Sequence, residues 1–101
     1  MIDAADTIAA FVTGRARPDL DTDRMFLFAL IRAIEIMGEA AARLSPETRA
    51  AEPTVPWALM IGMRNRVIHA YFDIDADILW RTVTEEIPKL KPILTELAAR
   101  P

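Results

Sequence analysis

One long run of helical periodicity constrains this chain more than any other feature. Apolar residues recur every three or four positions for about five turns, in an order typical of a helix with one buried face. They are Phe26, Leu30, Ala33, Ile34, Met37, Ala41 and Leu44. Asp21, Thr22 and Asp23 precede the run and can cap a helix. This segment is expected to be the central helix of the fold.

Two shorter segments precede and follow the central helix. Ile2 to Val12 has apolar residues at a helical period, and Gly14 is expected to end that helix. Ser45 and Pro46 have the residue types of an N-cap and a first helical position, and they predict a short helix.

The second half of the chain predicts two more helices. From Trp57 onwards apolar residues again recur every three or four positions, and this helix is expected to carry an arginine-rich segment ending at His69. Residues 71–74 are typical of a linker, and Asp75 can cap a last helix. Pro88 and Pro92 are expected to kink that helix.

No stretch alternates with period two over a useful length, and there are only three glycines. The chain of 101 residues fits one compact domain. The sequence therefore predicts a single all-α domain over residues 1–101, an up-down bundle of four to five helices with a kinked C-terminal helix.

Composition limits the classes of partner. The formal charge of −3 disfavours broad nucleic-acid binding, which needs many phosphate contacts, so any RNA contact is expected to be local. No apolar run approaches the roughly 18 residues of a membrane span, and the first residues are acidic where a signal peptide is basic. A cytoplasmic protein is expected. Because 52% of the residues are hydrophobic in so small a chain, a homodimer is expected to cover an exposed apolar face.

The segment 64–71, Arg-Asn-Arg-Val-Ile-His-Ala-Tyr, holds the chain's one histidine. Arginine can bind a phosphate with a planar fork of donors, and histidine transfers protons near neutral pH. Arg64, Arg66 and His69 together therefore indicate phosphodiester chemistry. If the segment were entirely helical, Asn65 and His69 would share a face, and Asn65 could orient the imidazole or the scissile group.

In a regular helix, Arg64 and His69 would lie about 140° apart around the axis. Either the helix loosens near His69, or the site forms between two copies of the chain. Cleaving RNA without metal requires a proton to leave the 2′-OH, a stabilised phosphorane and a proton for the leaving oxygen. One histidine cannot easily serve both proton transfers, and a two-fold dimer would supply two.

A structural alternative exists for each of these residues. Spacing alone favours ion pairs between Arg64 or Arg66 and carboxylates on a neighbouring helix. Gly38 is costly inside a helix, so a neighbouring helix is expected to pass close to it, and Glu39 is a candidate to support the arginines. One histidine and no cysteine give no credible zinc site, so neither a metal nor another cofactor is expected.

The order of these features resembles the HEPN family, in particular its HepT-like toxin branch. The matching pieces are Ala33–Ala41, Pro56-Trp57, Met63–Phe72 and the helix beginning near Asp77, which together cover nearly the whole chain. An R-x-x-x-x-H pair alone is common by chance, but its combination with the Gly-Glu helix, the tryptophan and the tyrosine is more specific.

The resemblance implies a helical homodimer acting as a metal-independent endoribonuclease, with Arg64 and His69 in the catalytic motif. It places Asn65 in the family's usual polar position. With the catalytic pair so placed, Asn65 and Arg66 are expected to position the RNA. The resemblance further implies a toxin paired with an MNT-type nucleotidyltransferase antitoxin, in an assembly that can be larger than the dimer. Tyr71 is then the residue to which the antitoxin attaches AMP, and the added bulk and negative charge would silence the site.

Two other functions stay open. A non-catalytic HEPN-like dimer could bind and modulate a nucleotidyltransferase, and it would bind its partner without cleaving RNA. A nucleotide-binding bundle would use Arg64 and Arg66 to hold a phosphate, and its binding would be unaffected by His69→Ala.

Overall fold

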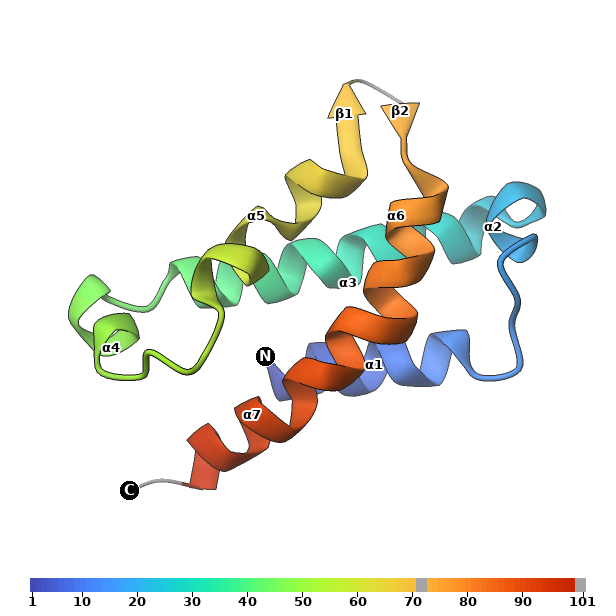
Figure 1. Cartoon of the computed structure of the whole chain (residues 1–101). Helices are drawn as coiled ribbons and strands as arrows, with labels where there is room; N and C mark the ends of the chain where they lie inside the picture. Colours follow the sequence, from blue (N-terminus) through green and yellow to red (C-terminus); the bar gives the residue numbers. More distant parts are fainter. Residues whose placement is uncertain (71–72, 100–101) are drawn as a thin grey trace.

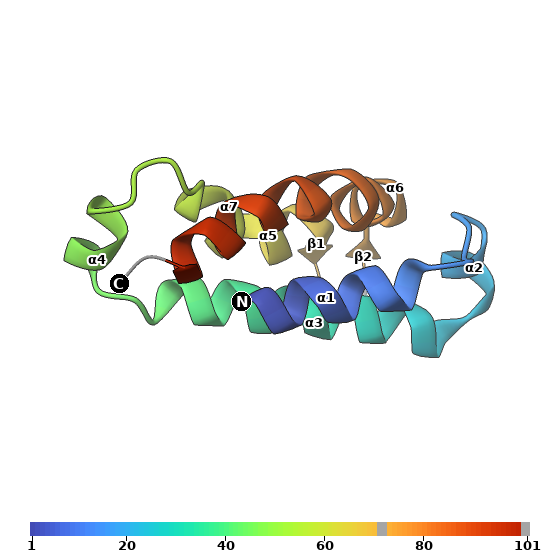
Figure 2. The same cartoon turned by 90° about the horizontal axis from the view of Figure 1, so that it is seen from below.

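The helices pack in two layers. The computed structural model describes residues 1–70 and 73–99, without the side chains of residues 69 and 70 (Figure 1). Figure 2 shows α1 (Ile2–Val12) and α3 (Arg24–Ala42) side by side in one layer. The other layer contains α5 (Trp57–Val67) and a C-terminal helical run. The prediction of an all-α bundle is confirmed.

The C-terminal run has three parts, namely α6 (Ala76–Arg81), a π-helical turn η1 (Thr82–Glu86) and α7 (Ile87–Ala99). The short helices α2 (Asp19–Thr22) and α4 (Pro46–Ala50) lie in the connections that flank α3. In the described part of the chain, no helix is both long and apolar enough to cross a membrane.

The hydrophobic core lies between the two layers. The stripe expected along α3 is buried from Phe26 to Ala41, whereas Leu44 follows the helix and is half-buried. Side chains that meet this stripe include Ile8, Met60, Met63, Leu79 and Val83, each at most 1% exposed. The long periodic run is therefore the central element of the core, as the sequence predicted.

Helices α3 and α5 pack closely at Gly38. A Cβ atom built on Gly38 would lie 3.2 Å from the carbonyl oxygen of Met60, which is tighter than ordinary van der Waals contact. The expected neighbouring helix is therefore α5. Since Gly38 lies against Ile61 and Glu35 contacts Arg64, the two helices run antiparallel.

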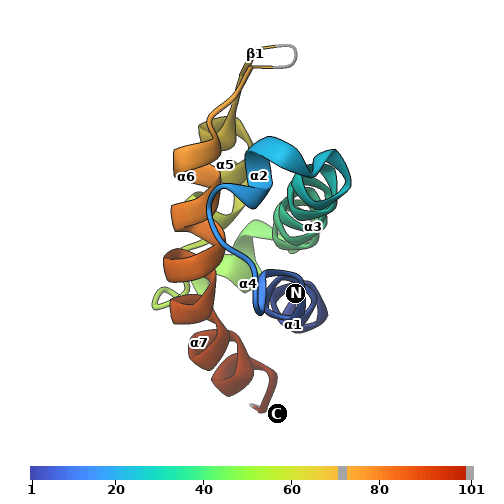
Figure 3. The same cartoon turned by 90° about the vertical axis from the view of Figure 1, so that its right-hand side faces the viewer.

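A small antiparallel hairpin follows α5. Its strands are β1 (Ile68–Ala70) and β2 (Asp73–Ile74), with Ile68 opposite Ile74, and Figures 1 and 3 show them projecting from the bundle. The predictions that the helix would continue through His69 and that residues 73–74 would belong to a linker are wrong. β-Branched Ile68 favours extended backbone, and the Asp75 N–H closes the hairpin on the Val67 carbonyl at 2.7 Å.

The C-terminal run is irregular next to Pro88. Proline has no N–H for the carbonyl four residues earlier, and its ring crowds that carbonyl. The π-helical turn η1 widens the helix immediately before Pro88. Thr82 and Thr84 within it donate their hydroxyls to the carbonyls of Ile78 and Trp80, each at 2.7 Å. The expected disturbance thus takes the form of a π-helical turn within a continuous helical run.

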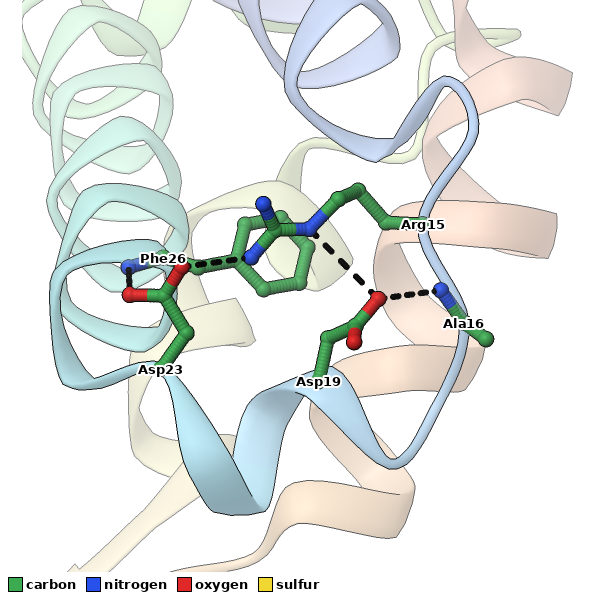
Figure 4. Close-up of polar contacts among 5 residues, drawn as sticks. All are labelled: Arg15, Ala16, Asp19, Asp23 and Phe26. Atoms are coloured by element: carbon green, nitrogen blue, oxygen red, sulfur yellow. Dashed lines mark hydrogen bonds and ion pairs between the residues drawn. The ribbon is translucent and has the colours of Figure 1, made fainter.

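An arginine holds the connection between α1 and α3 in place. Figure 4 shows the Arg15 guanidinium over the Phe26 ring, 4.1 Å from its centroid, with Asp19 and Asp23 around it. Arg15 Nη2 lies 2.7 Å from the Asp23 carboxylate, and Arg15 Nε lies 3.5 Å from that of Asp19. Asp23 also caps α3 by accepting the Phe26 N–H at 3.1 Å. Asp23 therefore both caps α3 and anchors the preceding loop.

We expect Asp23→Asn to lower the free energy of unfolding only where the carboxylate is charged. The hydrogen bond from Arg15, and next that from the Phe26 N–H, hold the pKa of Asp23 below its ordinary value of 3.8. A group whose pKa is depressed by folding stabilises above its unfolded pKa and loses that contribution as the pH falls through the folded value. Asparagine keeps the cap, so the difference from wild type should be largest near pH 7 and vanish well below pH 3.8. Urea unfolding across this range measures it, and a constant difference would contradict the assignment.

Candidate phosphodiester site

The arginine-rich segment lies where α5 gives way to the hairpin. Arg64, Asn65 and Arg66 occupy the last turn of α5, and all three are exposed. Val67, the final residue of the helix, is buried and fixes the end of α5 on the core. The three polar side chains are therefore presented to solvent on a helix end that the core holds in place.

Arg64 contacts the central helix. Its Nε donates to Oε1 of Glu35 on α3 at 3.0 Å, and the Arg64 side chain is 53% exposed. Glu35 also accepts from Arg32 one turn earlier at 3.3 Å. A guanidinium has five N–H donors, so a contact through Nε orients the group without using all of its capacity to bind an anion.

Arg66 forms a two-pronged ion pair with the C-terminal run. Nη1 and Nη2 lie 3.1 Å from the two carboxylate oxygens of Glu86 in η1. This fork geometry uses both terminal nitrogens at once. The structural alternative from the sequence is thus found for both arginines. Glu86 is half-buried, whereas the neighbouring Glu85 is exposed.

His69 is the middle residue of β1. Of the two alternatives expected from the sequence, the structure shows the first in part, because the backbone changes from helix to strand at Ile68. Asn65 and His69 do not share a helix face, because Asn65 belongs to α5 and His69 to β1. The His69 side chain and all of Tyr71 lie outside what the structure describes.

A hollow of about 220 Å³ adjoins Arg64 between α3 and α5. Its lining comprises Glu35, Gly38, Glu39, Ala42, Ile61 and Arg64. Glu39 forms an ion pair with Arg32 of its own helix at 3.6 Å. Glu39 and Arg64 line the same hollow without forming an ion pair with each other. Among residues whose side chains are described, no three acidic, histidine or cysteine groups gather as a metal-binding cluster.

Two partners of the site were missed from sequence alone. Glu35 precedes Gly38 by one helical turn, and the close approach expected at Gly38 could have directed attention to it. Glu86 lies 20 residues beyond Arg66, and no local spacing pointed to that pair.

We expect these ion pairs to contribute little to stability. For Arg64 and Glu35, a double-mutant cycle with alanine should give a coupling below about 1 kcal/mol, because exposed pairs are screened by water. The Arg66–Glu86 coupling should be the larger of the two, because its contact is two-pronged. Urea unfolding of the single and double variants measures both. A larger coupling for Arg64 and Glu35 would contradict this ranking.

Comparisons with known proteins agree with this architecture. The family model described as "Ribonuclease HepT-like" matches residues 1–97. The chain belongs to this family of HEPN-type helical proteins. It is 40% identical over 89 residues to a Thermococcus cleftensis protein described as "Probable ribonuclease HepT", covering 88% of this chain and 81% of that one.

A second relative comes from Methanocaldococcus jannaschii. This protein, described as "Putative RNase", is 37% identical over 91 residues, which are 90% of this chain and 84% of its own length. The comparison with solved structures gives no match.

Proposed function

We propose that this protein is a metal-independent endoribonuclease whose site forms where two copies of the chain meet. The observation that carries the proposal is the placement of Arg64 on the last exposed turn of α5, directly before the strand that contains His69. The descriptions of the relatives as ribonucleases support RNA as the substrate.

In this proposal, His69 moves the protons and Arg64 stabilises charge. The attacking 2′-OH loses its proton to one imidazole, and the leaving 5′ oxygen gains a proton from a second. Arg64 donates to the non-bridging oxygens of the phosphorane, which carry the developing negative charge. Each chain has one histidine, so a pair of histidines requires two chains.

The outer face of α3 supports self-association. Met25 and Ile36 are 84% and 45% exposed, and they lie three turns apart on one side of the helix. Arg32 and Glu39 share that side, so the face carries both apolar groups and charges of both signs. A two-fold interface needs such a self-complementary surface.

Asn65 and Arg66 are proposed to position the RNA backbone beside Arg64. To bind a phosphate, Arg66 must give up one of its two hydrogen bonds to Glu86. This is feasible because both side chains are solvent-accessible. Glu39 supports the site as part of the hollow that adjoins Arg64.

Regulation is proposed to act through Tyr71, with an MNT-type nucleotidyltransferase antitoxin attaching AMP to it. Tyr71 is two residues beyond His69 in the sequence. The AMP phosphate would compete with RNA for the same arginines. This step is tested by incubating the purified protein with a purified MNT-type nucleotidyltransferase and ATP, and then analysing Tyr71 by mass spectrometry. An unmodified Tyr71 would contradict it.

Activity is tested by incubating the purified protein with a mixed RNA pool in EDTA and mapping the new ends. We expect cleavage that leaves a 2′,3′-cyclic phosphate, since the 2′-OH is the nucleophile. A His69→Ala preparation purified in parallel controls for contaminating nuclease. No cleavage by a protein whose Tyr71 carries no AMP would overturn the proposal.

A second candidate function is a non-catalytic dimer that binds and modulates a nucleotidyltransferase. The ion pairs of Arg64 with Glu35 and of Arg66 with Glu86 favour it, because both guanidinium groups already have carboxylate partners. It predicts partner binding that is retained in His69→Ala, together with no RNA cleavage by the unmodified protein.

A further inference from the structure

A second hollow, also of about 220 Å³, lies near the N-terminal end of α3 and beside strand β2 of the hairpin. The hollow that adjoins Arg64 lies nearer the C-terminal end of α3. Leu20, Asp21, Arg24, Leu27, Phe28, Ile74 and Ala76 form the lining of the second hollow. The walls are thus mainly apolar, with one cation and one carboxylate. None of these residues has a role in the proposed cleavage chemistry.

Phe28 gives this hollow a partly exposed aromatic ring. Its side chain is 48% exposed although phenylalanine usually buries most of its surface. The Arg24 guanidinium lies 5.4 Å from the centre of its ring. Proteins that bind single-stranded nucleic acids combine aromatic rings, on which bases stack, with cationic side chains that contact the phosphates. Phe28 and Arg24 are such a combination.

The hairpin connects this hollow to the strand that contains His69. Ile74 forms part of its wall, and Ile74 is opposite Ile68 in the register of the two strands. Ile68 immediately precedes His69 in β1. A nucleotide chain running from the end of α5 past the hairpin would therefore reach Phe28.

We infer that Phe28 and Arg24 form a nucleobase subsite, in which one unpaired base of the RNA substrate stacks on Phe28. Arg24 contacts the phosphate next to that base. This inference rests on the proposed function, because the ligand is the RNA that the site would cleave. It explains how an acidic chain binds RNA locally, with stacking in place of a broad basic surface.

The test measures binding of a short single-stranded RNA by fluorescence anisotropy at fixed ionic strength, in a His69→Ala background that prevents cleavage. We expect Phe28→Leu, which keeps apolar bulk but removes the aromatic face, to weaken binding about five- to a hundredfold. Phe11→Leu is the matched control, because Phe11 is similarly exposed at 41% but belongs to α1. The Phe11→Leu variant should bind the RNA with the same affinity as the parent His69→Ala protein.

Scanning one abasic nucleotide along the RNA locates the stacked base. One position should weaken binding by the parent as much as Phe28→Leu does, and the two changes together should cost no more than either alone. Unchanged binding by Phe28→Leu would overturn the subsite, as would an equal loss with Phe11→Leu.

Sedimentation of every variant separates base stacking from self-association. If Phe28→Leu dissociates the dimer and raising the protein concentration restores RNA affinity, Phe28 belongs to the protein interface and the subsite is overturned. Wild-type cleavage with no effect of Phe28 on binding would refute the subsite alone. Phe28-dependent binding without wild-type cleavage would support the subsite and refute the nuclease.

Discussion

RNA cleavage by His69→Ala is expected to be about 10²–10⁴-fold slower than by wild type, since general acid–base catalysis contributes that range. Arg64→Ala is expected to lose about 10²–10³-fold, as for the removal of one donor to a developing oxyanion. Both rates are measured as single-turnover decay of a labelled RNA in EDTA with protein in excess. Arg81→Ala, which removes another exposed arginine of the described chain, should keep the wild-type rate. Wild-type rates in both site variants would disprove their catalytic assignment.

Dimers with one wild-type and one His69→Ala subunit extend this test. If two histidines share one site, such mixed dimers should be nearly as slow as the fully substituted dimer, because one of the two proton transfers is lost. If each chain has a site of its own, mixed dimers should retain half the wild-type rate. Tagging the two subunits differently allows the mixed species to be purified. Half activity would contradict a shared pair of histidines.

The second large effect is expected at Gly38. Gly38→Leu should lower the free energy of unfolding by about 1–3 kcal/mol, the usual cost of inserting atoms into a well-packed region. The side chain has no room, because its first atom would already lie 3.2 Å from the Met60 carbonyl oxygen. Pushing α3 away from α5 should also disturb the Glu35–Arg64 contact one turn away. Urea unfolding measures the change.

Alanine variants at two glycines provide the control for Gly38. Gly38→Ala and Gly62→Ala both gain helix propensity, worth about 1 kcal/mol. A Cβ on Gly62 meets no atom within 4 Å, so Gly62→Ala should be stabilised by the full amount. Gly38→Ala should gain less, because of the Met60 carbonyl. Equal stabilisation of the two variants would show that the contact at Gly38 is not restrictive.

Much of the fold followed from local patterns in the sequence. The buried stripe of α3, the bounds of α1 from Ile2 to Val12 and the caps by Ser45 and Asp75 depend on residues within a few positions of one another. The hairpin could not be predicted in the same way. Ile68 continues the apolar period of α5, and strands of three and two residues are too short to show alternation.

In the candidate site, too, the features that depend on local sequence could be predicted and the long-range contacts could not. Residue types and spacing drew attention to Arg64, Asn65, Arg66 and His69, and their position beside α3 was indicated by Gly38. The partners of the arginines depend on which helix turns face each other in three dimensions. Neither Glu35 nor Glu86 could be identified without that arrangement.

The change from helix to strand at Ile68 has a consequence for the spacing between Arg64 and His69. Within a helix, one inserted residue rotates everything after it by about 100°, whereas within a strand it moves the following side chains to the opposite face. The register of the hairpin already shifts between Ile68 and Ala70, so the strand does not alternate regularly at His69. An inserted residue there would therefore change the position of His69 relative to Arg64 without the simple reversal expected in a regular strand.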